Sequence, residues 1–147
     1  MFGFKETTPV ADERIRAILE ELEINFTIDE DFDFRVGFQM SDDRTQSCII
    51  RSRTYKFLDI EIREISSGAL LSEGPFDART ANILLQENER LSIGAWGVVH
   101  SSDDQHIAVF TAKIAADLPA PEFQGVLNAV LATADDMEKR LSGRDDF

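Results

Sequence analysis

The amino-acid sequence predicts a two-layer α+β domain, in which an antiparallel sheet packs against helices. Three observations support this fold class. Apolar residues recur at three- and four-residue spacing near both ends of the chain, as in amphipathic helices. Between them, apolar and polar residues alternate, as in strands with one buried face. The length of 147 residues suits one domain, 1–147, which we expect to be ordered over about 8–142 and to end in a polar, frayed tail, 143–147.

The first helix is expected after Thr8. This residue can cap the helix, and Pro9 suits the first helical position because its missing N–H would have no partner there. Asp12 and Glu13 then lie favourably near the positive end of the helix dipole. One apolar stripe follows at helical spacing: Ile15, Ile18, Leu19 and Leu22.

Three strands joined by short links are expected next, over 32–40, 45–55 and 57–65. In the first, Phe32 to Met40 alternates apolar and polar residues, and "SDDR" (41–44) has turn chemistry. In the third, Leu58, Ile60 and Ile62 alternate with charged residues. Consecutive strands with short links form an antiparallel meander.

The second half of the chain begins with a break, "SSGALLSEGPF" (66–76). Asp77 can cap a second helix, 78–91, and two strands follow over 92–99 and 106–115, with the polar loop 101–105 between them. "LPAPE" then ends the sheet, and the last helix starts near Pro121 and runs to Leu141. The order of elements is therefore helix, three strands, helix, two strands, helix.

The last two strands form a ribbon that is apolar on both faces. Antiparallel pairing across loop 101–105 puts His100 opposite His106, and Val98 opposite Ala108. It also puts Trp96 opposite Phe110, and we interpret the glycines of "GAWG" as room for a large ring or a crossing helix. Helices in a small domain cover one face well, so we expect the other face to be covered by a wrapped segment or by another subunit. The candidate interface residues are Trp96, Val98 and Phe110.

Composition limits the classes of partner. The net charge of −13 repels phosphate backbones and anionic lipid heads, so we expect neither nucleic acid nor a membrane surface as a partner. The chain has no run of about 18 apolar residues and no secretory signal, and one cysteine fits a reducing compartment. We therefore expect a cytoplasmic protein, with Cys48 as a small core residue rather than a nucleophile.

The residues from Ala81 to Leu141 resemble the YbjN-like family of bacterial sensory-transduction regulators. The resemblance rests on Asn88 in the polar helix end, Gly94 with Trp96 in the following strand, the Leu118–Pro119 break, and Ala134–Asp135 in the last helix. It implies a fold similar to that of type III secretion chaperones, which have the same order of elements. Such chaperones are small acidic homodimers that bind extended client segments, and the resemblance carries no catalytic residues.

Three constellations remain to be weighed. Arg51, Arg53 and Tyr55 alternate onto one face of the second strand and could contact an anion or an acidic peptide, although pairing with neighbouring acids explains them better. His100 and His106 could chelate a metal, but hairpin-end histidines usually hold none. The aspartates of "DEDFDF" imitate a calcium loop but lack its glycine and its final glutamate, so a turn is expected.

The sequence contains no catalytic motif, and we expect no enzyme activity, no cofactor and no metal. The first hypothesis is a chaperone-like or adaptor protein that forms a homodimer and binds a polypeptide client. The alternative is a regulatory module that senses a small anionic ligand through Arg51, Arg53 and Tyr55.

Overall fold

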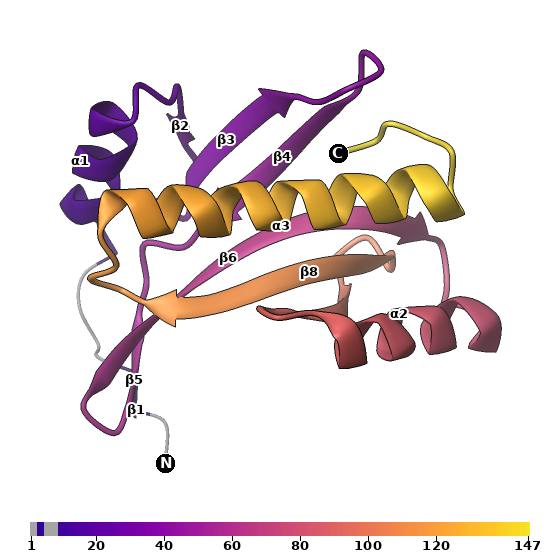
Figure 1. The fold of residues 1–147 in the computed structure, drawn as a ribbon. Helices are drawn as coiled ribbons and strands as arrows, with labels where there is room; N and C mark the ends of the chain where they lie inside the picture. The colour runs from indigo at the N-terminus through magenta and orange to yellow at the C-terminus, as the bar shows by residue number, and fades with distance from the viewer. Residues whose placement is uncertain (1–2, 5–8) are drawn as a thin grey trace.

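The structure is a computed structural model that describes residues 3–4 and 9–147, and it confirms the predicted α+β class. The described residues form three helices and one antiparallel sheet of eight strands (Figure 1). The helices are α1 (Glu13–Glu21), α2 (Ala78–Arg90) and α3 (Ala120–Leu141). The strands are β1 (Gly3–Phe4), β2 (Thr27–Ile28), β3 (Phe34–Gln39), β4 (Thr45–Ile50), β5 (Tyr55–Phe57), β6 (Ile60–Ser72), β7 (Ala95–His100) and β8 (His106–Ala115).

Strand β6 is the centre of the sheet. From Ile62 to Ser72 it pairs with β8 on one side, and β7 then pairs with β8 as an outer strand. On its other side, the beginning of β6 pairs with β5, and the next residues pair with β4, which leads outward to β3 and β2. The predicted order of elements is present, with the short strands β1, β2 and β5 added to it.

The first helix starts later than predicted. Its N-cap is Asp12, whose side chain accepts a hydrogen bond from the N–H of Arg14, so Pro9 is not the first helical residue. Aspartate is a strong cap because its carboxylate satisfies an N–H that has no partner within the helix. The expected cap Thr8 lies outside the described residues.

The predicted strand boundaries were wrong in three places. The expected strand 57–65 contains a turn, because Leu58, with φ of +55°, and Asp59 link the end of β5 to the start of β6. The expected strand 45–55 ends at Ile50 and resumes only at Tyr55, because the link between β4 and β5 turns to meet the start of α1. The expected break at 66–76 is instead the second half of β6, whose hydrogen bonds to β8 continue to Ser72 through an irregularity near Gly68. The local sequence correctly indicated an irregularity at Gly68, but pairing with the long strand β8 keeps the chain in the sheet beyond it.

The C-terminal half agrees closely with expectation. Asp77 caps α2, with its carboxylate accepting from the N–H of Thr80. The hairpin register puts His100 opposite His106 and Trp96 opposite Phe110, as predicted. Helix α3 has a proline in its first turn and packs across the sheet in Figure 1. None of the described helices is long and apolar enough to cross a membrane.

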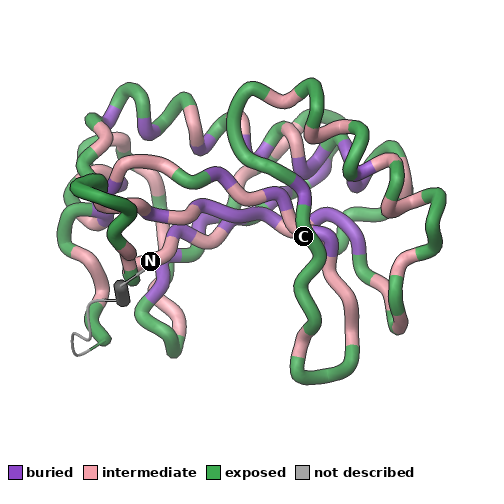
Figure 2. The backbone as a smooth tube through the Cα atoms, turned by 90° about the horizontal axis from the view of Figure 1, so that it is seen from below, coloured by how far each residue is buried: buried purple, intermediate pink, exposed green. Residues whose placement is uncertain are grey.

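All three helices contribute to one core, on one face of the sheet. Ile15 and Leu19 of α1, Leu84 of α2 and a long stripe of α3 join the same buried cluster as the inward side chains of β3, β4, β6, β7 and β8. Figure 2 shows buried stretches running through the middle of the sheet and exposed residues along its outer hairpins. The opposite face, which we call the outer face, carries none of the described helices.

The tail 143–147 is held in place rather than frayed. Gly143 adopts a left-handed conformation, with φ of +66°, and turns the chain back after α3. The carbonyl of Arg144 then accepts a hydrogen bond from Arg44 at 2.6 Å, and the carboxylate of Asp145 accepts one from the N–H of Thr45 at 3.1 Å. These contacts link the end of the chain to the β3–β4 hairpin, about 100 residues earlier, a link that local sequence pattern does not encode.

Candidate functional site

The inner face of the β7–β8 ribbon is part of the core. Trp96 and Phe110 are 5% and 1% exposed, and their ring centroids lie 5.4 Å apart. These two residues therefore offer no surface to a partner as long as the chain stays folded. Val98 is the exception among the three candidate interface residues, because nearly half of its surface is exposed. Trp96 and Phe110 are therefore no longer candidate interface residues.

Of the two glycines in "GAWG", Gly94 is the one that packs closely against another part of the chain. Its φ is +70°, and a Cβ there would lie 2.6 Å from the carbonyl oxygen of Thr111 and 2.8 Å from the Phe110 ring. Nothing lies within 4 Å of a Cβ placed on Gly97. The close approach expected from "GAWG" is therefore real, but only the first of its two glycines makes it.

The outer face of the ribbon carries a row of exposed aliphatic side chains. Leu71 of β6 is directly opposite Ile107 of β8, which is directly opposite Val99 of β7, so the three side chains share one face. Leu71 and Val99 are 44% and 49% exposed, and Ile107 is half-buried. Val109 of β8 extends this surface toward the centre of the sheet. We call Leu71, Val99, Ile107 and Val109 the outer ribbon patch.

The outer ribbon patch is unusual for a sheet face that no described helix covers. A solvated antiparallel sheet normally alternates polar residues outward, and β3 does so with Arg35 and Gln39. The ribbon end presents aliphatic groups instead. Contiguous apolar surface of this kind marks interaction sites on soluble proteins. The sequence predicted that both ribbon faces are apolar. In the structure the core covers Trp96, Ala108 and Phe110 on the inner face and leaves Val98 exposed, whereas no described helix covers the outer face.

The second candidate set does not form a cationic pocket. Arg51 and Arg53 lie in the link between β4 and β5 instead of on one strand, and Tyr55 begins β5. The guanidinium of Arg51 donates to the carboxylate of Asp33 at 2.7 Å, and Asp33 also accepts from the N–H of Ser52. This carboxylate takes the place that an anionic ligand would need at Arg51, so the anion-sensing alternative has the weaker support.

A polar network joins this link to the start of α1. The buried guanidinium of Arg63 donates to Asp12 at 2.6 Å and to the carbonyl of Arg51 at 2.6 Å. Burial of Asp12 raises its pKa, but hydrogen bonds from Arg14 and Arg63 outweigh that effect and lower it to about 2. Hydrogen bonds from Arg14 and Thr54 lower the pKa of Glu61 to about 2 as well. Every charge here has a partner, so the network is structural.

The two histidines stack at the end of the ribbon. Their ring centroids lie 4.7 Å apart with an interplanar angle of 28°, and Nε2 of His100 lies 2.7 Å from a carboxylate oxygen of Asp104. Stacked rings direct their nitrogens roughly parallel rather than toward one point, which does not suit chelation by both. The expectation that this pair holds no metal stays a prediction.

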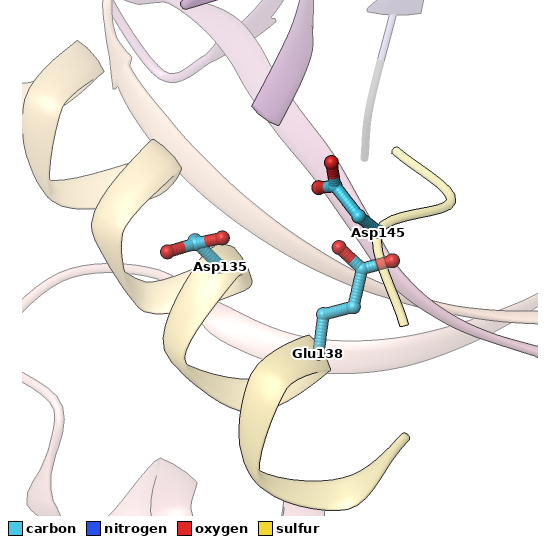
Figure 3. A group of neighbouring side chains, drawn as sticks. All are labelled: Asp135, Glu138 and Asp145. Carbon is cyan, nitrogen blue, oxygen red and sulfur yellow. The ribbon is translucent and has the colours of Figure 1, made fainter. Parts of the chain in front are cut away.

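Three carboxylates gather at the end of α3. Figure 3 shows Asp135 and Glu138 on the helix and Asp145 on the tail. One carboxylate oxygen of each residue lies within 4.8 Å of the other two. Arg44 enters the same cluster, donating to Asp135 at 2.8 Å and to Glu138 at 3.0 Å. Burial raises the pKa of Glu138. The guanidinium already supplies the positive charge, so we assign the cluster a structural role in holding the tail.

Cys48 is a core residue, as expected. It is 2% exposed, and burial raises the pKa of its thiol to about 12. Thiolate is the nucleophilic form, so this cysteine is unreactive at neutral pH.

Sequence reasoning missed the outer ribbon patch in part and the tail contacts entirely. The sequence pattern predicts a break at Leu71, whereas in the structure it follows a register shift between Gly68 and Leu70 and lies on the face opposite that of the buried Leu70. Arg44 was assigned to a turn, and nothing in its neighbourhood signals partners in α3. The chain matches no model of a known protein family, and a search of curated proteins finds no significant match.

Proposed function

We propose that the protein is a non-enzymatic, chaperone-like or adaptor protein that forms a homodimer and binds a polypeptide client. One observation carries this proposal: the row Leu71, Ile107, Val99 is apolar, contiguous and accessible on the sheet face opposite the helices. A second copy that placed the same row against it would remove both rows from water, and an isologous interface needs only one self-complementary patch.

Membership of the YbjN-like family, with its secretion-chaperone-like fold, is part of the same proposal. The residues that carry the resemblance have definite roles in the structure. Asn88 binds the backbone of Trp96, Pro119 precedes α3, and Asp135 binds Arg44. The net charge of −13 favours solubility and a basic or unfolded client, which supports a chaperone-like role in the cytoplasm.

The mass of the protein in solution tests the proposal. Light scattering is expected to give twice the 16.5 kDa of one chain, and Val99→Asp is expected to give one chain mass. The matched control is Thr27→Asp, which places the same charge at an exposed position on the same face of the sheet in β2, away from the patch. A wild-type protein that stays at one chain mass at high concentration would contradict the homodimer.

Trp96→Asp does not test the interface. Trp96 is 5% exposed and packs on Phe110, so a charge there breaks the core before it reaches any partner. Client binding is tested separately, by whether polypeptide that co-purifies with the wild-type protein at native expression level is lost in Val99→Asp and kept in Thr27→Asp.

A further inference from the structure

The sheet is open between β4 and β6 along the half of β4 that is nearer the β3–β4 turn. Only two residue pairs join these strands, Ile49 with Ser66 and Ile50 with Ile65. Beyond them, side chains bridge the gap: the amide of Gln46 donates to the carbonyl of Gly68 at 2.7 Å, and the hydroxyl of Ser67 donates to the carbonyl of Ser47 at 2.6 Å. This half of β4 is therefore an unpaired strand edge inside the sheet.

The tail occupies this opening as a peptide ligand would. The N–H of Asp146 donates to the carboxylate of Glu138 at 2.8 Å, and the carboxylate of Asp145 accepts from the backbone and the hydroxyl of Thr45. The ring of Phe147 lies against Gly68, where a Cβ would come within 2.5 Å of it. The domain thus makes separate contacts with the main chain of the tail, with one acidic side chain and with one aromatic ring. Domains that recognise short linear segments make the same kinds of contact.

Two observations show that the tail fills the opening incompletely. Phe147 is one wall of a cleft of about 400 Å³ whose other walls belong to β3 and β4, and the cleft is not filled by any described side chain. Gln46, which also lines the cleft, is fully buried, yet its Oε1 accepts no hydrogen bond from any residue that the structure describes. Buried acceptors normally have a donor, and the N–H of a longer segment could supply one.

We infer that the opening between β4 and β6 is a binding slot for an extended segment of another polypeptide, and that residues 144–147 occupy it in cis. The slot consists of Arg44, Thr45, Gln46, Gly68 and the adjoining cleft. The segment it fits has an acidic residue two positions before an aromatic residue, the chemistry of Asp145 and Phe147, and continues past the ring into the cleft.

The occupant that the slot fits is a separate polypeptide segment with this acidic and aromatic pattern. The N–H and the hydroxyl of Thr45 receive its carboxylate, the guanidinium of Arg44 donates to its main-chain carbonyl, and Gly68 leaves room for its ring. Exchange of tails between two copies is the other occupant, and the mass of Phe147→Ala in the test below distinguishes it.

Peptide binding to the full chain tests the slot. The probe is a fluorescent peptide with the sequence of residues 142–147 followed by four alanines that extend into the cleft. Its N-terminus is acetylated and its C-terminus is amidated. In Phe147→Ala the cis ring is gone, and we expect the peptide to bind at least about tenfold more tightly than it binds the wild type. Adding Gly68→Ala is expected to reverse this gain, because the new Cβ takes the position of the ring.

Two controls complete the test. A peptide with alanine in place of phenylalanine is expected not to bind, and Val99→Asp, which leaves the slot intact, is expected to bind as the wild type does whatever its mass. A folded Phe147→Ala protein that does not bind the peptide at millimolar concentration would overturn the inference. So would equal binding with and without Gly68→Ala, or a Phe147→Ala protein that falls to one chain mass while Val99→Asp does not.

If Phe147→Ala does not fold, Asp145→Asn replaces it. This change weakens the hold of Thr45 on the tail and leaves the ring in place. Tighter peptide binding than in the wild type supports the slot, and unchanged binding contradicts it.

Discussion

The side chain of Asn88, in the last turn of α2, binds both backbone polar groups of Trp96 in β7. Its Oδ1 accepts from the Trp96 N–H at 2.7 Å, and its Nδ2 donates to the Trp96 carbonyl at 3.3 Å. One amide side chain thus takes the place of a neighbouring strand at the outer edge of the sheet. Unpaired strand edges invite pairing with other chains, and this contact closes part of that edge beside the buried indole.

Replacing Asn88 is expected to reopen this edge. Asn88→Ala leaves the N–H and the carbonyl of Trp96 without their partner, which is expected to cost about 1–3 kcal/mol of unfolding free energy. Chemical denaturation measures the loss, and hydrogen exchange should show faster exchange of the Trp96 amide. The control is Asn82→Ala, which changes an exposed asparagine of the same helix and should have little effect. Equal effects of the two variants would show that helix propensity, not the edge contact, is responsible.

The two glycines of the "GAWG" stretch are expected to respond oppositely to alanine. Gly94→Ala places a Cβ in a left-handed backbone against the Thr111 carbonyl and the Phe110 ring, and we expect a loss of about 2–4 kcal/mol. Gly97→Ala meets nothing within 4 Å and reduces the freedom of the unfolded chain, so we expect it to be neutral or up to about 1 kcal/mol stabilising. Urea denaturation of the pair distinguishes them, and similar losses in both would argue against the close approach at Gly94.

Stability is expected to fall in acid below pH 4.5. The pKa values of Asp12 and Glu61 are both about 2 in the folded protein, below their ordinary values of 3.8 and 4.5, because arginine hydrogen bonds favour their charged forms. The unfolded chain therefore binds more protons, and the stability that these groups contribute at neutral pH is lost as pH falls toward 2. Denaturation midpoints at several pH values measure this loss, and it should be smaller in Asp12→Asn.

Glu138 is expected to change the stability in a higher pH range than Asp12 and Glu61 do, and in the opposite direction. Burial raises its pKa above the ordinary 4.5, so its contribution to stability is present below 4.5 and is lost as pH rises through the raised value. Between neutral pH and 4.5 the wild type should therefore gain stability relative to Glu138→Gln. Parallel pH profiles of the two proteins in this range would contradict a raised pKa at Glu138.

Local pattern was sufficient for the C-terminal half of the fold. The cap at Asp77, the register of the β7–β8 hairpin and the stripe of α3 depend on residues a few positions apart, and the structure has them as predicted. The same reasoning failed at β6, because a strand that pairs with a ten-residue partner continues through a glycine that would end a shorter one.

The candidate site, too, was predicted from the sequence only in part. Period-two alternation predicted that the ribbon is apolar on both faces, but it could not tell which face the helices cover. The choice follows from which face the helices pack against: α2 contacts β7 and α3 contacts β8 on the face of Trp96 and Phe110, and Val99 on the other face is left exposed. The basic stripe of Arg51, Arg53 and Tyr55 assumed a continuous strand, and the link between β4 and β5 removes that premise.

The sequence by itself determined the fold class, the order of the main elements, the hairpin pairing and the apolar character of the ribbon, because each is encoded in spacing along the chain. Only the tertiary structure decided which ribbon face is accessible, that Arg44 meets Asp135 and Glu138, and that the tail fills the opening beside β6. The reason is physical. Contacts between residues about 100 positions apart depend on how whole elements pack, and no local period records that packing.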